Sequence, residues 1–304
     1  MEREKTALLL PGTAGVLPTK ARALLEVPAI KYQTGEIGAI TGLDIEQGTT
    51  GGDLSDFLVA QQLQLITSVE LGKKVMRALR PDFLVGDSLG EYSALCLAGA
   101  FDLTVAAVLI QERAKLLTLV RNGAMAKVEA APEFVREVIR PYLRLEIAAI
   151  SGPAEVTITG YSDQVEKAVK EFVEERKVAA RVFKRPKVAS HSTLLKGTRL
   201  DDFHKYLGTF EFHPLSYPVV ATNRAAVLPA DDPREVKRYL KEQMITPVRL
   251  YDTVRFLWNE GVRRFVEVGA TLFAGKKVSA IFPEAEVFAI DSQKSLDEFK
   301  QLVG

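Results

Sequence analysis

A serine flanked by two glycines is the feature that most constrains the fold of this chain. Residues 86–90 read Gly-Asp-Ser-Leu-Gly and follow a short apolar run at 83–85. Residues 92–98 open a helical pattern, so Ser88 is predicted at a strand-to-helix turn. The glycines allow the turn to tighten and leave the serine oxygen exposed at the helix start, where backbone N–H groups can stabilise an oxyanion. Such a turn places a nucleophile at the carboxyl edge of a sheet, although so short a motif also arises by chance.

The flanking segments favour an α/β domain around this turn. Residues 6–10 form an apolar run ended by Pro11-Gly12, typical of a buried strand and a tight turn. Residues 264–268 form a similar run ended by Gly269. Helices are predicted at 56–80, 233–243 and 250–261.

The middle of the chain has a different pattern. Strands are predicted at 124–128, 145–150, 156–159 and 180–188, and helices at 132–143 and 162–178. This βαββαβ order is typical of a ferredoxin-like subdomain. We therefore predict an α/β protein with a large α/β-hydrolase-like domain containing a parallel sheet (residues 1–122 and 189–304) and a small inserted ferredoxin-like subdomain (residues 123–188).

Composition excludes several classes of function. The 304 residues are 47% apolar and 26% charged, which is typical of a globular protein with a full core. The chain has 40 basic and 39 acidic residues, so no surplus of charge points to nucleic acid or an anionic membrane as a partner. The single cysteine, Cys96, excludes an internal disulfide and argues against a metal site; we expect it to be a small buried residue. With no apolar run near the roughly 20 residues of a membrane span and no signal-peptide pattern, a cytoplasmic protein is expected.

A serine nucleophile needs a base, and the chain has three histidines. His191 lies at the exit of the predicted subdomain, where a loop can return to Ser88. His204 lies in a charged, helical segment typical of a solvated surface, and His213 precedes a proline, which favours an extended structural position. His191 is therefore the predicted base.

The chain resembles the malonyl-CoA:acyl carrier protein transacylases and the polyketide synthase acyltransferases of the discrete, trans-acting type. The resemblance covers essentially the whole length. It rests on residues 11–12, 86–95, 112–113, 123–126, 191–192, 243, 247–249 and 267–269.

This resemblance implies a role for each site residue. Ser88 would attack a thioester and His191 would transfer the proton, with no acidic third member. The backbone N–H groups of Leu89 and Thr13 would form the oxyanion hole, and Arg113 would bind the free carboxylate of a malonyl group. Gln61 and Gln243 match pocket glutamines of the family.

Each of these matches has a simpler alternative. Arg113 could be an ordinary solvated helix residue, and Gln243 could be a surface helix residue. Glu267 and Arg249 more plausibly hold structure than perform chemistry.

Two departures from the family bear on the site. The usual Pro-Gly-Gln-Gly is Pro-Gly-Thr-Ala at residues 11–14, which removes a side chain but keeps the backbone N–H of Thr13. Asp87 stands where the family commonly has histidine. It could repel a substrate carboxylate, pair with Arg113, accept a hydrogen bond from a hydroxyl or amino group of the acyl chain, or point away from the substrate.

Ser190, just before His191, bears on acyl size. Residues 188–191 read Val-Ala-Ser-His, resembling the Tyr-Ala-Ser-His type associated with substituted malonyl units. A serine leaves more pocket volume than a phenylalanine would. The sequence therefore favours an α-substituted malonyl group, such as a methyl, hydroxy or amino derivative.

The predicted function is that of a free-standing, monomeric acyltransferase that loads an acyl carrier protein through an acyl-serine. The donor would be acyl-CoA or an acyl-phosphopantetheine carrier protein, and no bound cofactor, nucleic acid or membrane is expected. The alternatives are an acyl hydrolase that clears carrier proteins and a catalytically silent docking module. Carrier proteins are acidic, so the basic run at 184–187 is either a docking surface or a solvated face.

Overall fold

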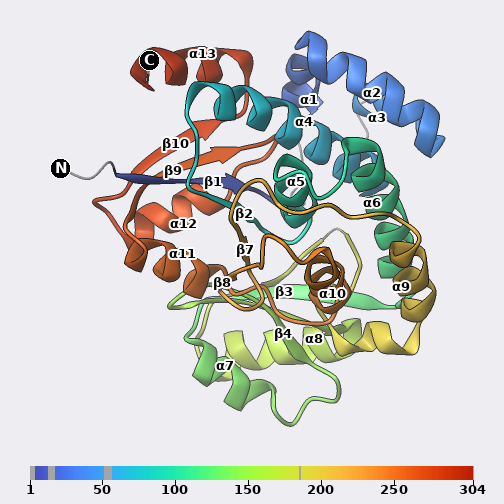
Figure 1. Cartoon of the computed structure of the whole chain (residues 1–304). Coiled ribbons are helices and arrows are strands. Elements are labelled where there is room, and N and C mark those ends of the chain that lie inside the picture. The colour runs from blue at the N-terminus through green and yellow to red at the C-terminus, as the bar shows by residue number, and fades with distance from the viewer. Residues whose placement is uncertain (1–3, 13–17, 51–56, 185, 304) are drawn as a thin grey trace. The chain divides into compact units, whose positions relative to one another are not determined.

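A computed structural model of the chain describes residues 4–12, 18–50, 57–184 and 186–303 (Figure 1). These residues divide into two units. The first is formed by residues 1–111, 211–236 and 253–304, and the second by residues 112–210 and 237–252. The predicted subdomain at 123–188 falls within the second unit.

The first unit contains a six-stranded sheet in the order β10-β9-β1-β2-β7-β8. Its strands are β1 (Lys5–Leu10), β2 (Phe83–Gly86), β7 (Val219–Ala221), β8 (Ala226–Val227), β9 (Val262–Val268) and β10 (Glu286–Ile290). All neighbours are parallel except β7 and β8, so the predicted parallel sheet is in fact mixed. β2 pairs with β1 on one side, and β9, which comes much later in the chain, pairs with β1 on the other side. Such a switch point is where ligands bind at the carboxyl edge of an open sheet.

Helices cover both faces of this sheet. The helices against its strands are α4 (Phe57–Ala78), α5 (Gly90–Leu97), α12 (Ala274–Ile281) and α13 (Gln293–Val303), whereas α1 (Pro18–Leu25), α2 (Pro28–Thr41) and α3 (Ile45–Thr50) pack on one another and on α4. Figure 1 shows α4 and α13 on one face and α12 on the other. This double cover explains why β1 is buried from Thr6 to Leu10.

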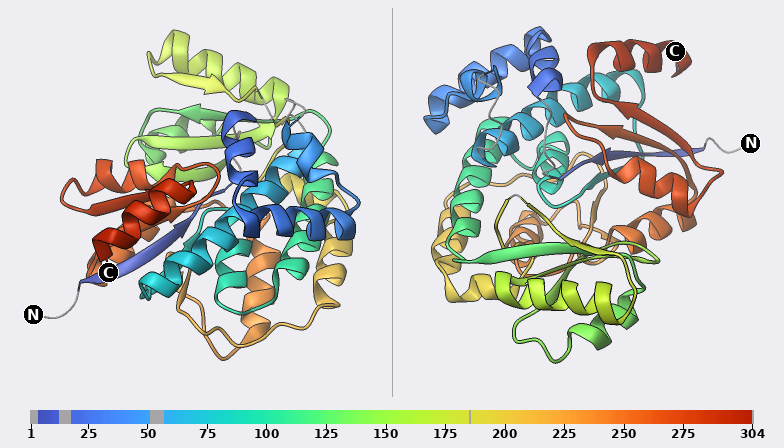
Figure 2. Two further views of the ribbon diagram at one scale, coloured as in Figure 1. Left: turned by 90° about the horizontal axis from the view of Figure 1, so that it is seen from above. Right: turned by 180° about the vertical axis from the view of Figure 1, so that it is seen from behind.

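The second unit contains a four-stranded antiparallel sheet in the order β4-β5-β3-β6. Its strands are β3 (Gly123–Val128), β4 (Glu146–Gly152), β5 (Glu155–Tyr161) and β6 (Ala180–Val182). The helices α7 (Pro132–Ile139) and α8 (Ser162–Lys170) lie along one face, as the right-hand view in Figure 2 shows. They pack on it through Val135, Val165 and Phe172, the last from a π-helix at Glu171–Glu175. The observed order of strands and helices is the predicted βαββαβ.

Three helices contain residues of both units, namely α6 (Leu103–Thr118), α10 (Pro233–Gln243) and α11 (Leu250–Asn259). The second unit also has α9 (Leu200–Gly208), which contains His204, and a 3-10 turn at Thr193–Gly197. Among the described residues, no helix is long and apolar enough to cross a membrane.

Two elements are shorter in the structure than the sequence predicted. The helix predicted at 132–143 ends at Ile139, because Pro141 lacks a backbone N–H and Arg144 adopts a left-handed φ of 54°. The strand predicted at 180–188 ends at Val182, one residue before Phe183, whose N–H still bonds the carbonyl of Met125.

Candidate active site

Ser88 lies at a strained turn between β2 and α5, as predicted. Its φ is 53°, a left-handed value that residues other than glycine rarely adopt. The backbone on either side is fixed: Asp87 N–H donates to the Leu10 carbonyl at 2.9 Å, and Gly90 N–H to the Asp87 carbonyl at 2.8 Å. Strain held in this way is characteristic of a nucleophile elbow, where it presents the hydroxyl above the sheet.

Both glycines of the motif are required by close backbone contacts. A Cβ atom on Gly86 would lie 2.1 Å from the Glu91 nitrogen. One on Gly90 would lie 1.8 Å from the carbonyl oxygen of Leu10. Helix α5 therefore begins directly against the end of β1, and only glycine at these positions permits that approach.

Leu89 is fully buried and immediately precedes α5. The first N–H groups of a helix lack acceptors within the helix, and this end carries the positive end of the helix dipole. The position suits the predicted oxyanion role of the Leu89 N–H. Thr13, the other predicted donor, lies outside the described residues.

The Asp87 carboxylate is directed toward the turn that follows β1. A Cβ on Gly12 would lie 3.4 Å from the Asp87 Oδ2 atom and 2.8 Å from its carbonyl oxygen. The residue is half-buried. The first unit thus carries a carboxylate at the same sheet edge as the predicted nucleophile.

Helix α4 contains three buried glutamines. Gln61, a predicted pocket residue, is fully buried, as are Gln62 and Gln64. Gln62 donates to the carbonyl of Ala107 at 2.8 Å. The side-chain Oε1 atom of Gln64 accepts hydrogen bonds from the N–H and the hydroxyl of Thr271, and these bonds fix the loop after β9.

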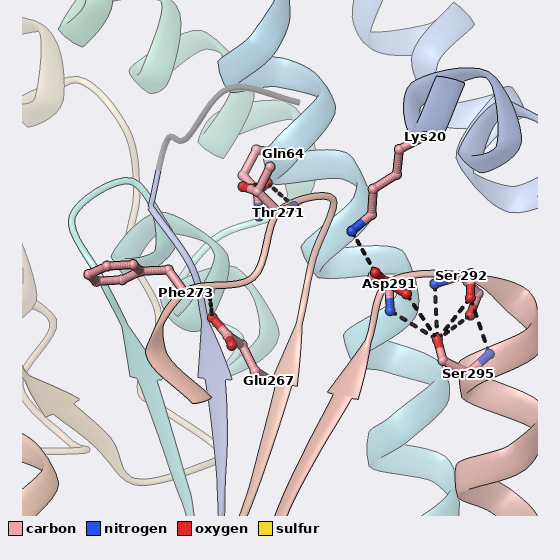
Figure 3. A network of polar contacts seen from close by, with 8 residues as sticks. All are labelled: Lys20, Gln64, Glu267, Thr271, Phe273, Asp291, Ser292 and Ser295. Carbon is pink, nitrogen blue, oxygen red and sulfur yellow. Dashed lines mark hydrogen bonds and ion pairs between the residues drawn. The ribbon is translucent and has the colours of Figure 1, made fainter. Parts of the chain in front are cut away.

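Glu267 holds structure, as its sequence position suggested. Its carboxylate accepts the N–H groups of Phe273, Ala274 and Gly275 at 2.6, 2.7 and 2.8 Å, which caps α12 (Figure 3). Burial raises the pKa of Glu267, although these three bonds act in the opposite direction. On the adjacent strand end, Asp291 pairs with Lys20 at 2.5 Å. These contacts order the carboxyl edge of β9 and β10.

His191, in the second unit, is held through one ring nitrogen. Its Nδ1 atom lies 2.9 Å from the Gln243 carbonyl oxygen and 3.1 Å from that of Thr246. Because carbonyl oxygens only accept, Nδ1 must carry the proton, which leaves Nε2 as the basic nitrogen. His191 itself adopts a left-handed φ of 54°. Two backbone carbonyls thus orient the imidazole ring.

The segment that supplies these carbonyls is anchored to β4. Val248 N–H donates to the Ala148 carbonyl at 2.9 Å, and Ile150 N–H donates to the Val248 carbonyl at 2.8 Å. Arg249 pairs with Asp252 at 2.8 Å, a structural role as expected. This anchoring fixes the peptide groups that position His191.

The pKa of His191 is lowered to about 4. Burial is the largest cause because it disfavours the charged imidazolium, and the nearby Arg113 cation is the second. The two carbonyl hydrogen bonds act in the opposite direction. His191 is consequently neutral at pH 7 and can accept a proton at Nε2.

Arg113 and Gln243 are not surface residues, so the simpler alternatives for both are wrong. Their exposed fractions are 2% and 1%. A buried arginine is rare unless its charge is compensated, which makes an incidental helix position implausible. Ser190, beside His191, is also buried. Within the second unit, His191 contacts the Gln243 carbonyl and lies near the Arg113 charge, whereas Ser88, Asp87, Leu89 and Gln61 belong to the first unit.

The remaining candidate groups differ from His191. His213 is exposed, and His204 is half-buried in α9 with a pKa lowered by burial. Cys96 is half-buried rather than fully buried, and burial raises the pKa of its thiol to about 12, so it is not a thiolate nucleophile. Within the part of the chain that the structure describes, no group of three or more His, Cys, Asp or Glu side chains is placed to bind a metal ion.

Thr246 is a site residue that the sequence did not indicate. It acts through its backbone carbonyl, a group that every residue carries, so its side chain gave no signal. Gln243 was singled out by its match to a family glutamine, and its backbone carbonyl makes the observed bond to His191.

Comparisons with known proteins show the family to which the chain belongs. A family model described as "Acyl transferase domain" matches residues 58–273. The polyketide biosynthesis protein ThaF of Burkholderia thailandensis is 33% identical over 207 residues, which are 67% of this chain but 18% of ThaF. The polyketide biosynthesis malonyl CoA-acyl carrier protein transacylase PksC of Bacillus subtilis is 30% identical over 211 residues, covering 68% of this chain and 72% of PksC.

A solved structure extends the likeness over the whole fold. The crystal structure of an acyl-carrier-protein S-malonyltransferase from Burkholderia pseudomallei superposes with a TM-score of 0.88 at 27% identity, covering 98% of this chain and 99% of that one. The family model itself spans more than half of the chain. Together with the similarity to PksC over most of its length, this shows that the chain belongs to the acyl transferase domain family.

Proposed function

We propose that this chain is a free-standing acyltransferase that carries a malonyl-type acyl group on Ser88 and transfers it to the phosphopantetheine thiol of an acyl carrier protein. The observation that carries the proposal is the strained elbow at Ser88, with its two obligatory glycines. The neutral, Nδ1-protonated His191 supports it, because it is the one form of histidine that can act as a base through Nε2.

In the first half-reaction His191 Nε2 accepts the Ser88 hydroxyl proton while the Ser88 oxygen bonds to the thioester carbonyl carbon. The carbon–sulfur bond then breaks, and the leaving sulfur takes the proton from Nε2. In the second half, the carrier thiol gives its proton to Nε2 and its sulfur attacks the Ser88 ester. The Ser88 oxygen leaves and regains the proton, so the enzyme ends unchanged.

Both tetrahedral intermediates carry a negative oxygen that needs hydrogen-bond donors. The N–H of Leu89 at the start of α5 is the proposed first donor, and that of Thr13 is the second. Because these are backbone groups, the proposed donors do not require the family glutamine side chain after Gly12.

Arg113 is the proposed site for the distal carboxylate of the acyl group. A guanidinium binds a carboxylate through two parallel hydrogen bonds, and burial makes such a pair stronger than it would be in water. Gln61, Ser190 and Gln243 would line the same pocket, and all three are buried. Ser190 leaves room for a substituent on the α carbon of malonate.

The proposed carrier and donor follow from the names of the relatives. PksC and the Burkholderia pseudomallei protein are both named for acyl carrier protein, and PksC also for malonyl-CoA. We infer the same carrier class here, with acyl-CoA or an acyl-carrier protein as donor, no bound cofactor, and a monomer. The four-stranded unit is proposed to be the ferredoxin-like subdomain, at 123–188, of an α/β-hydrolase-like domain. Exposed Lys184 and Lys187 are candidate contacts for an acidic carrier.

An acyl hydrolase is the alternative within this fold. It would use water where the transferase uses a thiol. The buried Arg113 favours the transferase, because a hydrolase of simple acyl chains has no use for a carboxylate-binding cation. A silent docking module would not need the strained Ser88 conformation.

The test is intact-mass analysis of the protein with malonyl-type thioesters, followed by addition of a carrier protein bearing its phosphopantetheine arm. A transferase gives an acyl adduct that moves to the carrier faster than it hydrolyses. Rapid release of free acid with no acyl-carrier product would favour the hydrolase. Absence of any adduct would support the docking module.

A further inference from the structure

The loop that follows β9, residues 269–273, is held by two side chains of the first unit. The N–H of Phe273 donates to the Glu267 carboxylate at 2.6 Å. The N–H and the hydroxyl of Thr271, in the middle of the loop, donate to the Oε1 atom of Gln64 at 3.0 and 2.9 Å (Figure 3). Helix α4 therefore reaches the carboxyl edge of the sheet through the side chain of Gln64.

Both ends of the Gln64 amide are bonded. Because a backbone N–H can only donate, the amide atom that faces Thr271 must be the oxygen. The amide nitrogen then donates to the hydroxyl oxygen of Ser68 at 3.0 Å. Gln64 and Ser68 are fully buried, and a buried polar group that loses its partner is costly. Gln64 is thus held in one orientation, and it holds Thr271 in one place.

Gly269, the first residue of the loop, packs between helix α4 and the turn that follows β1. A Cβ atom on Gly269 would lie 2.4 Å from the Gln64 Nε2 atom, 2.7 Å from the Pro11 Cγ atom and 2.9 Å from the Ser68 hydroxyl oxygen. Helix α4, the loop and the turn therefore meet around one glycine. Because packing there is tight, a change at Gln64 would be felt at Pro11.

The same turn also contacts the elbow. Asp87 N–H donates to the Leu10 carbonyl at 2.9 Å, and a Cβ atom on Gly12 would lie 2.8 Å from the Asp87 carbonyl oxygen. Ser88 follows Asp87, and its left-handed conformation persists only while its surroundings hold it. The turn at Pro11 and Gly12 thus lies between the contacts of Gln64 and the proposed nucleophile, within one unit.

We propose that Gln64 is a positioning residue that holds Ser88 in its reactive conformation through the loop after β9 and the turn after β1. This inference rests on the proposed function, because it requires Ser88 to be the nucleophile. A small displacement of a reacting group lowers the rate of the chemical step strongly. Loss of the Gln64 bonds should therefore lower the maximal acylation rate and leave donor binding unchanged.

The test is the rate of Ser88 acylation by malonyl-CoA and by methylmalonyl-CoA, followed by intact mass over a range of donor concentrations. Gln64→Leu keeps the bulk and removes the bonds, and it should lower the maximal rate about tenfold while the half-saturating donor concentration stays within about twofold. Gln64→Glu still has an oxygen that accepts from Thr271, and it should keep the rate within about threefold of the unchanged protein.

Gln62→Leu is the matched control. Gln62 lies on the same helix and is equally buried, but its amide donates to the carbonyl of Ala107 in α6 at 2.8 Å. Its replacement also removes a buried hydrogen bond, so it should lower the free energy of unfolding without lowering the acylation rate.

The outcomes separate the role of Gln64 from the proposed function. An unchanged maximal rate in Gln64→Leu, an equal loss in Gln62→Leu, or a loss that Gln64→Glu shares in full would overturn the positioning role and leave the acyltransferase intact. If Gln64→Leu fails to fold, Thr271→Val, which removes one of the two bonds to Gln64, should react about threefold more slowly than Thr271→Ser, and equal rates would overturn the role. Absence of a Ser88 adduct in the unchanged protein with both donors would instead refute the proposed function itself.

Discussion

Ser88 and His191 are non-glycine residues held in left-handed backbone conformations, with φ values of 53° and 54°. Each such residue stores strain of about 1–3 kcal/mol, which persists only where the surroundings fix it. At Ser88 the backbone bonds to Leu10 and Gly90 flank the strained residue, and at His191 the carbonyls of Gln243 and Thr246 hold the ring. Both residues of the predicted Ser-His pair are therefore held in a strained backbone conformation.

The low pKa of His191 predicts how activity depends on pH. The base works only when neutral, so the acylation rate should be constant from pH 8 to about 5.5 and fall below that as His191 is protonated near pH 4. Single-turnover acylation rates across this range are the measurement. A fall centred near 6.5, the ordinary value for histidine, would contradict a buried and neutral His191.

The lowered pKa of His191 also makes the free energy of unfolding depend on pH. The unfolded chain binds a proton at His191 near pH 6.5, whereas the folded protein does so only near pH 4. The unfolded state thus binds more protons in this window, and His191 lowers the free energy of unfolding as the pH falls from about 6.5 to 4. Urea unfolding of the His191→Gln variant should show a weaker loss of stability over this window than the unchanged protein. An identical loss would place the cause elsewhere.

Replacing Arg113 by alanine should change two properties together. Acylation by dicarboxylic thioesters should fall roughly a hundredfold, while acylation by acetyl thioesters should not, because only the former present a carboxylate. The pKa of His191 should also rise, since the Arg113 charge lowers it. The readouts are donor selectivity and the pH midpoint of acylation. Arg121→Ala, an exposed residue beyond the same helix, is the matched control, and an equal loss in both variants would exclude a specific role for Arg113.

At the scale of the elements, the packing of α5 against the end of β1 determines the site. Gly90→Ala would force a methyl group to 1.8 Å from the Leu10 carbonyl and should destabilise the protein by about 3 kcal/mol or more. Gly35→Ala is the control, because a Cβ there meets nothing within 4 Å in the exposed middle of α2, and it should be neutral or stabilise by about 0.5–1 kcal/mol. Thermal unfolding compares the two. A small effect of Gly90→Ala would contradict the close approach.

Helix α12 depends in the same way on one carboxylate. Glu267→Ala removes the acceptor of three N–H groups and should lower the free energy of unfolding by about 1–3 kcal/mol. Glu286→Ala breaks an ion pair with Arg264 in a more exposed setting and should cost less than about 1 kcal/mol. Denaturant unfolding gives both values. Equal costs would mean that Glu267 does not cap α12.

Elements with strong local patterns were predictable from the sequence. The apolar residues at helical spacing predicted α4, and the helix predicted at 233–243 has the bounds of α10. The glycines around Ser88 indicated the elbow. Some element ends were not predicted. The strand from residue 180 stops at Val182, and α7 stops at Ile139 although Pro141 is a local signal for that end.

The site was predictable where side chains carry its chemistry and not where the backbone does. Ser88 and His191 have distinctive side chains whose types suggested their roles, whereas the role of Arg113 was implied by the family resemblance. The carbonyl of Thr246 and the left-handed conformation of His191 arise from the path of the chain, which residue identity does not encode. The direction of the Asp87 carboxylate toward Gly12 likewise follows from how β1 and β2 end.

At the scale of the whole molecule, the chain order explains why chemistry gathers where it does. In the first unit the strands diverge from β1 in both directions, so the carboxyl ends of β1, β2 and β9 form a switch point. The elbow, the Gly12 turn and the loop held by Gln64 all leave the sheet there. The second unit separately fixes a neutral base and a buried cation. Acyl transfer as proposed needs both sets of residues.

The central claim is that Ser88 carries the acyl group. The most direct measurement is intact mass followed by peptide mapping of the unchanged protein and of Ser88→Ala after incubation with malonyl and α-substituted malonyl thioesters, with Ser216→Ala as an exposed serine control. We expect one acyl adduct on the peptide containing Ser88 in the unchanged protein and in Ser216→Ala, and none in Ser88→Ala. An adduct that survives in Ser88→Ala, or one that maps to another residue, would contradict the claim.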